Sequence, residues 1–212
     1  MPEPIELKTA DGVTLEAELA MPTGPARCGL VLCHPHPQYG GTMRSIVISA
    51  LFDALPPQGV ACLRFNFRGV EGSEGAHDFG NLERVDAETA VAALADRLQH
   101  DVPLILTGWS FGADMALSVR DTRVDAWVAI APPLVAVHDL DGLAADPRPK
   151  LLALAQHDEF RDPTEVTEIA EHWANADVHV IGGASHFFVG RTDRLVEVTS
   201  GFVHRLSPAP SA

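Results

Sequence analysis

The fold of this chain is decided by the stretch Leu104-Ile105-Leu106-Thr107-Gly108-Trp109-Ser110-Phe111-Gly112. It opens with a short apolar run, as a buried parallel strand does, and Phe111–Val119 has the pattern of a helix. The pattern Gly-x-Ser-x-Gly between them predicts a strained turn that projects the serine hydroxyl above a sheet. Glycines two residues to either side leave room for the tight backbone crossing. Ser110 is therefore the candidate nucleophile.

Strand-like and helix-like segments alternate around this stretch. Apolar runs predict parallel strands at Gly29–Cys33, Val60–Phe65, Leu104–Thr107, Ala126–Ile130, Leu151–Ala155 and Val178–Ile181. Helical spacing is found at Ser45–Ala54, Leu82–Leu98, Phe111–Val119, Thr164–Trp173 and Leu195–Leu206. The alternation predicts an α/β fold with a mainly parallel sheet and helices on both faces.

Two details of this pattern are specific enough to test. Segments around Ile5–Lys8 and Leu15–Leu19, separated by Asp11-Gly12, predict a hairpin that forms an antiparallel edge of the sheet. In the second predicted helix, one face is expected to gather Leu82, Val85, Thr89, Ala92, Ala93 and Leu98.

Length and composition predict one domain over residues 1–212, with a disordered tail at 206–212. The net charge of −14 makes nucleic acid and anionic membranes unexpected partners. No run approaches the roughly 18 apolar residues of a membrane helix, and the acidic N-terminus does not resemble a secretory signal. An odd number of cysteines, Cys28, Cys33 and Cys62, indicates reduced thiols in a cytoplasmic protein. Cys33 and Cys62 lie in apolar runs that are typical of strands, which favours buried, structural side chains.

A serine hydroxyl needs a base, and His186 is the best-placed histidine. It follows the last predicted strand in a loop whose glycines allow the chain to bend back over the sheet. The orienting carboxylate is expected to be Asp158, which comes directly after the preceding strand. Glu159 and Asp162 in the same loop are alternatives.

The segment Cys33–Gly41 follows the first parallel strand and contains His34-Pro35-His36-Pro37. Because Pro35 and Pro37 lack an N–H, the backbone donors of this segment are those of His34, His36 and the residues from Gln38 onward. We expect the segment to be a rigid scaffold that aims the amide of His36 at the site. Two histidines two residues apart are weak evidence for a metal, and no third ligand is evident. We therefore expect no metal and no cofactor.

The loop Arg64–Gly75 is rich in charges and glycines and is expected to border the site. Arg68 either forms an ion pair with Glu71 or Glu74 or, less favourably, binds a substrate carboxylate. Aromatic candidates for a substrate pocket are Trp109, Phe187 and Tyr39, together with Phe111, although packing around the serine turn explains Trp109 and Phe111 equally well.

These motifs together resemble the α/β-hydrolase superfamily, over roughly residues 5–206. More closely, the chain is similar to a bacterial subgroup of small hydrolases with His-Pro-His-Pro followed by Gly-Gly-Thr-Met, here His34–Met43, and with Arg-Phe-Asn-Phe-Arg-Gly-Val, here Arg64–Val70. The order Ser110, Asp158, His186 fits this fold. The resemblance implies an esterase with an oxyanion hole formed by the amides of Phe111 and His36. It also implies kinship to dienelactone hydrolases, which use cysteine where this chain has Ser110.

Two positions depart from the subgroup's usual pattern. Glu71 stands where the loop more often reads Gly-Val-Gly-x-Ser, and Asp162-Pro163 replaces a common Val-Pro.

A third feature is the length of Ala131–Pro149, the gap in which many such hydrolases insert a lid. With fewer than about 20 residues it has room for a loop or one short helix, so no cap domain is expected.

The predicted function is hydrolysis of short-chain carboxylic esters, which are small-molecule substrates, through an acyl-enzyme. Acyltransferase, thioesterase or amidase activity on the same three residues is the alternative, because the acyl-enzyme step is common to all. A non-catalytic scaffold on a hydrolase fold is a third, less favoured interpretation. The sequence is also compatible with a homodimer.

Overall fold

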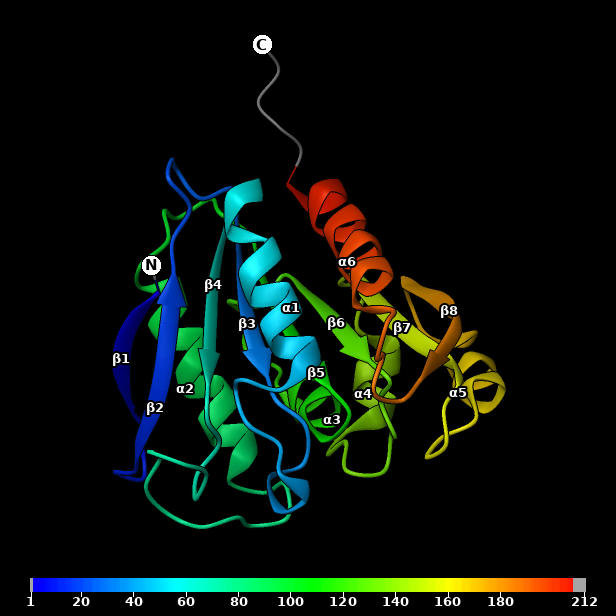
Figure 1. Cartoon of the computed structure of the whole chain (residues 1–212), viewed down its shortest axis with the longest axis horizontal. Coiled ribbons are helices and arrows are strands. Elements are labelled where there is room, and N and C mark those ends of the chain that lie inside the picture. The colour runs from blue at the N-terminus through cyan, green and yellow to red at the C-terminus, as the bar shows by residue number, and fades with distance from the viewer. Residues whose placement is uncertain (1, 208–212) are drawn as a thin grey trace.

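One mixed sheet organises the structure, a computed structural model that describes residues 2–207 (Figure 1). Within this range the sheet has eight strands in the order β1-β2-β4-β3-β5-β6-β7-β8. The strands are β1 (Glu3–Lys8), β2 (Thr14–Ala20), β3 (Cys28–Cys33), β4 (Val60–Phe65), β5 (Leu104–Trp109), β6 (Ala126–Ile130), β7 (Lys150–His157) and β8 (Ala176–Ser185).

The predicted antiparallel edge is confirmed. β1 pairs antiparallel with β2, β2 pairs antiparallel with β4, and every remaining pair is parallel. The four strands β3 to β6 are buried at every position, because helices cover both of their faces. β2, near the edge, alternates between buried and half-buried residues.

The helices are divided between the two faces of the sheet (Figure 1). α1 (Ile46–Ala54) and α6 (Thr192–Leu206) pack on one face, whose apolar core includes Phe52 and Phe202. α2 (Glu83–Ala95), α3 (Phe111–Ser118), α4 (Leu140–Ala145) and α5 (Pro163–Ala170) pack on the other. Two short 3-10 turns, η1 (Pro37–Tyr39) and η2 (Pro56–Gln58), complete the element order.

The face predicted for α2 is wrong. Leu82 is exposed, and Val85, Thr89, Ala92, Ala93 and Leu98 are only partly buried. The helix instead buries Glu83, Asp86, Ala87, Ala90, Val91 and Leu94. The two carboxylates point inward because hydrogen-bond donors inside the protein compensate for their burial. Glu83 accepts the N–H groups of Asp78 and Gly80, and Asp86 binds a buried arginine.

The gap in which a lid is common contains only the six-residue helix α4 and loops. At the chain end, Leu206 is the last helical residue of α6, and Ser207 is buried with its hydroxyl bonded to the carbonyl of Val203. The predicted disorder is therefore wrong for these two residues, and the rest of the predicted tail lies outside the described residues.

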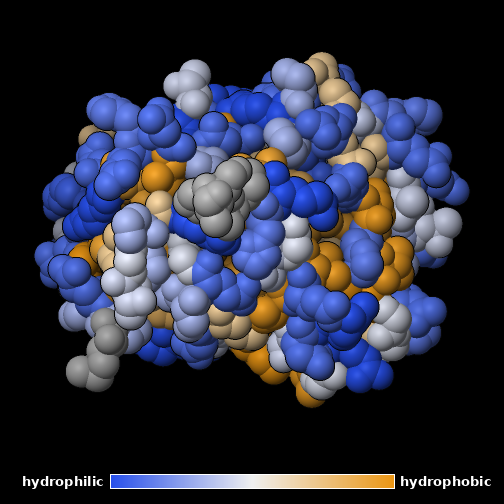
Figure 2. All heavy atoms as spheres, turned by 90° about the horizontal axis from the view of Figure 1, so that it is seen from above, coloured by the Kyte–Doolittle hydropathy of each residue, from blue (hydrophilic) through white to orange (hydrophobic). Residues whose placement is uncertain are grey.

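The end at which α6 finishes is mostly hydrophilic, with smaller apolar areas (Figure 2). At the opposite end, where the parallel strands finish, large apolar side chains are exposed on the connecting loops: Tyr39, Phe79, Val135, Phe160, Phe187 and Val189. Among residues 2–207, no helix is long and apolar enough to cross a membrane.

Candidate active site

Ser110 lies in the strained turn that its sequence motif predicts. Its φ of 55° and ψ of −123° place an L-residue in a region that rarely accommodates one. A Cβ on Gly108 would lie 2.0 Å from the carbonyl oxygen of Gly112, and a Cβ on Gly112 would lie 2.3 Å from that of Cys33. Both glycines are therefore required by the close crossing of β5, α3 and the end of β3.

Three loops bring Ser110, His186 and Asp158 together. The Ser110 hydroxyl lies 2.9 Å from Nε2 of His186, and Nδ1 of the same ring lies 2.8 and 3.0 Å from the two carboxylate oxygens of Asp158. The side chains of His186 and Asp158 are both nearly buried. These contacts fix the imidazole with Nδ1 toward the carboxylate and Nε2 toward the hydroxyl, the arrangement a base needs to remove the serine proton.

The acidic neighbours of Asp158 have different contacts. Asp162 accepts the N–H of Thr164 at 2.8 Å and caps α5. Glu159 accepts the backbone N–H of His186 at 3.0 Å, while the indole of Trp109 donates to the carbonyl of His186 at 3.1 Å. The structure thus places Asp158, not its two rivals, against the imidazole, and the backbone of His186 is held on both sides.

The two backbone amides that the family resemblance assigns to an oxyanion hole are those of Phe111 and His36. Phe111 opens α3, and His36 caps η1. Neither N–H has an acceptor among residues 2–207. His34 is fully buried, donates from Nδ1 to the carbonyl of Pro35 and accepts the N–H of Phe67 at Nε2. Because burial lowers the pKa of His34 to about 4, the ring is neutral and suits these two opposite roles.

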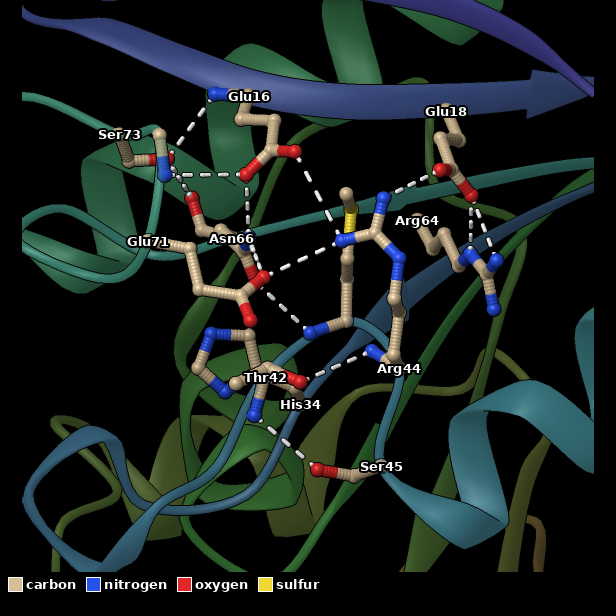
Figure 3. A network of polar contacts seen from close by, with 12 residues as sticks. Glu16, Glu18, His34, Thr42, Arg44, Ser45, Arg64, Asn66, Glu71 and Ser73 are labelled. Carbon is tan, nitrogen blue, oxygen red and sulfur yellow. Dashed lines mark hydrogen bonds and ion pairs between the residues drawn. The ribbon is translucent and has the colours of Figure 1, made fainter.

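A polar network fixes the segment after β3 against the loop after β4 (Figure 3). The buried Asn66 accepts the N–H of Met43 at 2.8 Å and donates to Glu16 at 2.7 Å and Glu71 at 2.9 Å. Arg44 adds an ion pair to Glu71. Glu71 adopts φ 46°, so the loop keeps the left-handed turn that a glycine makes easily, and its carboxylate is used in the network.

Neither partner predicted for Arg68 is correct. Arg68 is 2% exposed, donates to the buried Asp86 at 2.6 Å and pairs with Asp11 at 2.9 Å. Glu71 binds Asn66 and Arg44, and Glu74 accepts the N–H of Thr14. A guanidinium that is buried and already paired with two carboxylates is not accessible to a substrate carboxylate, so that alternative is also wrong.

The segment after β6 is held beside the serine turn by Asp114. This buried carboxylate of α3 accepts the N–H groups of Leu134, Val135 and Ala136 at 2.8 to 2.9 Å. Burial raises its pKa to about 6 in spite of these hydrogen bonds. The short segment in the lid position is therefore tied down to the body of the protein.

The predicted pocket aromatics occupy different environments. Trp109 is buried behind His186, so packing explains it. Phe187 is 47% exposed beside His186, and Tyr39 is 87% exposed, packed against the ring of His36. Phe160, which the sequence analysis missed, lies 4.6 Å from the ring of His186 and is 66% exposed. The sequence feature that could have identified Phe160 is its position two residues after Asp158, the candidate acid.

Within residues 2–207, no group of three or more histidine, cysteine or carboxylate side chains is arranged to hold a metal ion. The three cysteines are free and buried, and burial raises the pKa of Cys28 to about 12.

Fold and site together define the class: the chain belongs to the alpha/beta hydrolase domain family, whose sequence model matches residues 28–200. A relative in Rickettsia prowazekii (strain Madrid E), an uncharacterized protein, is 31% identical over 208 residues, which cover 90% of this chain and 87% of the relative.

Solved structures agree with this assignment. An alpha-beta serine hydrolase homologue from Coxiella burnetii is 31% identical with a TM-score of 0.85, covering 96% of this chain and 97% of that one. A serine hydrolase without a lid from Xanthomonas campestris is 26% identical with a TM-score of 0.87, covering 99% and 97%. The chain has the fold of the lidless α/β serine hydrolases.

Proposed function

We propose that this protein hydrolyses carboxylic esters with short acyl groups, with Ser110 as nucleophile, His186 as base and Asp158 as the orienting carboxylate. One observation carries the proposal: a continuous chain of hydrogen bonds runs from the Ser110 hydroxyl through both ring nitrogens of His186 to Asp158. The similarity to solved serine hydrolases supports it.

In the first half of the reaction, Ser110 Oγ attacks the ester carbonyl carbon while Nε2 of His186 takes the hydroxyl proton. The carbonyl oxygen becomes an oxyanion, which the amides of Phe111 and His36 stabilise; a preorganised donor of this kind is worth about 3–4 kcal/mol. Collapse of this intermediate breaks the bond to the alcohol oxygen. The imidazolium returns its proton to that oxygen, and the alcohol leaves.

In the second half, water replaces the alcohol. His186 removes a proton from the water, the resulting hydroxyl attacks the acyl carbon, and the same two amides stabilise the second oxyanion. Collapse returns the proton to Ser110 Oγ and releases the acid. Asp158 keeps Nδ1 protonated throughout, so Nε2 is available as acceptor at the start of each half.

We propose the preference for short acyl groups because the segment between β6 and β7 is too short to form a lid over the acyl chain. Each buried methylene is worth about 0.8 kcal/mol, but only if surrounding residues remove it from water. The segment between β6 and β7 supplies six helical residues in α4, and Asp114 holds its first part down. Methylenes beyond the first few carbons therefore remain hydrated.

Labelling with a fluorophosphonate probe tests this proposal, because the probe reacts with an activated serine. Wild-type protein is expected to label, and Ser110→Ala to remain unlabelled while keeping its fold by circular dichroism. An unlabelled wild type would mean a non-catalytic scaffold. A panel of matched esters, thioesters and amides then separates the reaction classes; faster turnover of a thioester or amide would overturn the assignment to esters.

A further inference from the structure

Two phenylalanine rings lie beside the imidazole of His186 on adjoining loops. The ring centre of Phe160 is 4.6 Å from that of His186, the ring centre of Phe187 is 5.6 Å from it, and the two phenylalanine centres are 6.0 Å apart. All three rings therefore touch or nearly touch one another, and both phenylalanines keep a large part of their surface in water.

Packing within the fold leaves much of both rings uncovered, although Phe187 also lies against the buried Trp109, with ring centres 6.3 Å apart. Phe188, the next residue, is fully buried in the core between the sheet and α6, whereas Phe187 and Phe160 are 47% and 66% exposed. The backbone of Phe160 is fixed by the hydrogen bond from its N–H to Asp158 at 2.9 Å. The carboxylate that orients His186 thus also holds this exposed ring next to it.

The proposed reaction determines which part of a substrate reaches these rings. Nε2 of His186 has to protonate the alcohol oxygen, so that oxygen lies within hydrogen-bond distance of the imidazole when the ester bond breaks. The first few carbon atoms attached to that oxygen then lie within reach of rings centred 4.6 and 5.6 Å from the imidazole. The acyl group is attached to the carbonyl carbon instead, next to Ser110 and the oxyanion amides.

We propose that Phe160 and Phe187 form a subsite for the leaving group, an inference that rests on the proposed ester hydrolysis. The enzyme then favours esters of apolar, especially aromatic, alcohols. An aromatic ring entering this space would cover exposed surface of both phenylalanines and stack edge-to-face with them. Aromatic pairs of this kind contribute about 0.5–1.5 kcal/mol beyond area burial, which corresponds to roughly a 2- to 12-fold effect for each contact. The two residues are specificity-determining and take no part in proton transfer.

The test compares benzyl acetate with ethyl acetate, which share one acyl group and therefore one acyl-enzyme. In wild-type protein, kcat/KM is expected to favour the benzyl ester. In Phe160→Leu and in Phe187→Leu, the benzyl-to-ethyl ratio is expected to fall about fivefold. Phe160→Tyr, which keeps the ring, is expected to retain the ratio. Deacylation is common to both esters, so the difference should appear in the release of alcohol during acylation.

Two controls make the result specific. The ratio of ethyl phenylacetate to ethyl acetate, which places the ring on the acyl side, should stay unchanged in both leucine variants. Phe79→Leu removes a phenylalanine that is 75% exposed but packs against His77, and should leave the benzyl-to-ethyl ratio unchanged.

Three results would overturn the inference. An equal loss on both acetates, with a shifted pH profile, would mean that the rings only shield His186 from water. A selective loss on ethyl phenylacetate would place the acyl group there, and an unchanged benzyl-to-ethyl ratio would mean no contact. Failure of the proposed function itself is recognised separately, since wild-type protein would then neither label with fluorophosphonate nor turn over any of these esters.

Discussion

Replacing Asp158 with asparagine separates the orienting role of this residue from its role in the fold of its loop. Oδ1 accepts the N–H groups of Phe160 and Arg161 at 2.9 and 3.2 Å, and an asparagine oxygen can keep both contacts. The asparagine NH₂ then faces Nδ1 of His186, which must accept instead of donate. The imidazole proton therefore moves to Nε2, which can no longer take the proton of Ser110.

A wrong tautomer of this kind costs about 10³–10⁴ in kcat in serine triads, or roughly 4–5.5 kcal/mol at 1.36 kcal/mol for each factor of ten. We expect a loss of this size in kcat for p-nitrophenyl acetate, with a thermal midpoint close to that of the wild type. Asp162→Asn is the matched control, because asparagine caps a helix about as well as aspartate; its activity should be near that of the wild type. The reasoning is refuted if Asp158→Asn retains more than a tenth of the activity, or if Asp162→Asn shows the large loss.

Three further predictions concern stability and substrate range. Gly112→Ala should lower the free energy of unfolding by about 1–3 kcal/mol or more, because its Cβ would lie 2.3 Å from a backbone oxygen; an unchanged urea midpoint would contradict this. Burial lowers the pKa of His34 from 6.5 to about 4, so its contribution to stability is present above pH 6.5 and is lost as the pH falls toward 4. The wild type should therefore lose more stability than His34→Gln between pH 7 and pH 4.5 in urea titrations, and parallel losses would show that His34 is not the responsible group. Across p-nitrophenyl esters, kcat/KM should peak at roughly two to six acyl carbons, whereas a steady rise to twelve would show a long apolar channel.

The sequence predicted those parts of the fold that depend on local pattern. β3 to β6 are recognisable because strands covered on both faces must be apolar throughout. The serine turn is recognisable because its backbone crossing excludes any side chain at Gly108 and Gly112. The positions of Asp158 and His186 followed from the rule that loops after parallel strands meet at one edge of the sheet.

The errors in the face of α2 and in the partners of Arg68 share a physical cause, which is burial of charge. The predicted face of α2 followed the helical periodicity of the less polar residues, so the burial of Glu83 and Asp86 was not predicted. Glu83 accepts N–H groups from the nearby Asp78 and Gly80, whereas the partner of Asp86 is distant in sequence. Asp86 binds Arg68, which also pairs with Asp11 in the turn between β1 and β2. Local pairing with Glu71 or Glu74 was the natural expectation for Arg68, and only the three-dimensional arrangement shows that other donors already occupy those two acids.

The choice among Asp158, Glu159 and Asp162 also could not be made from the local sequence. All three lie in one loop, and their spacing in sequence does not determine which carboxylate reaches the imidazole. The structure gives each a separate contact: with the imidazole, with the backbone N–H of His186, and with the first turn of α5. Phe160 was missed for a related reason, because an exposed aromatic in a loop has no periodic signal.

The turnover of Ser110→Ala tests the central claim most directly. The purified variant should have the circular dichroism spectrum and thermal midpoint of the wild type, because the hydroxyl contributes one hydrogen bond, to His186. Its kcat for p-nitrophenyl acetate should be lower by roughly 10⁴-fold or more, the size of loss seen when a catalytic serine is removed. Near-normal turnover by this folded variant would remove Ser110 from the mechanism and contradict the account.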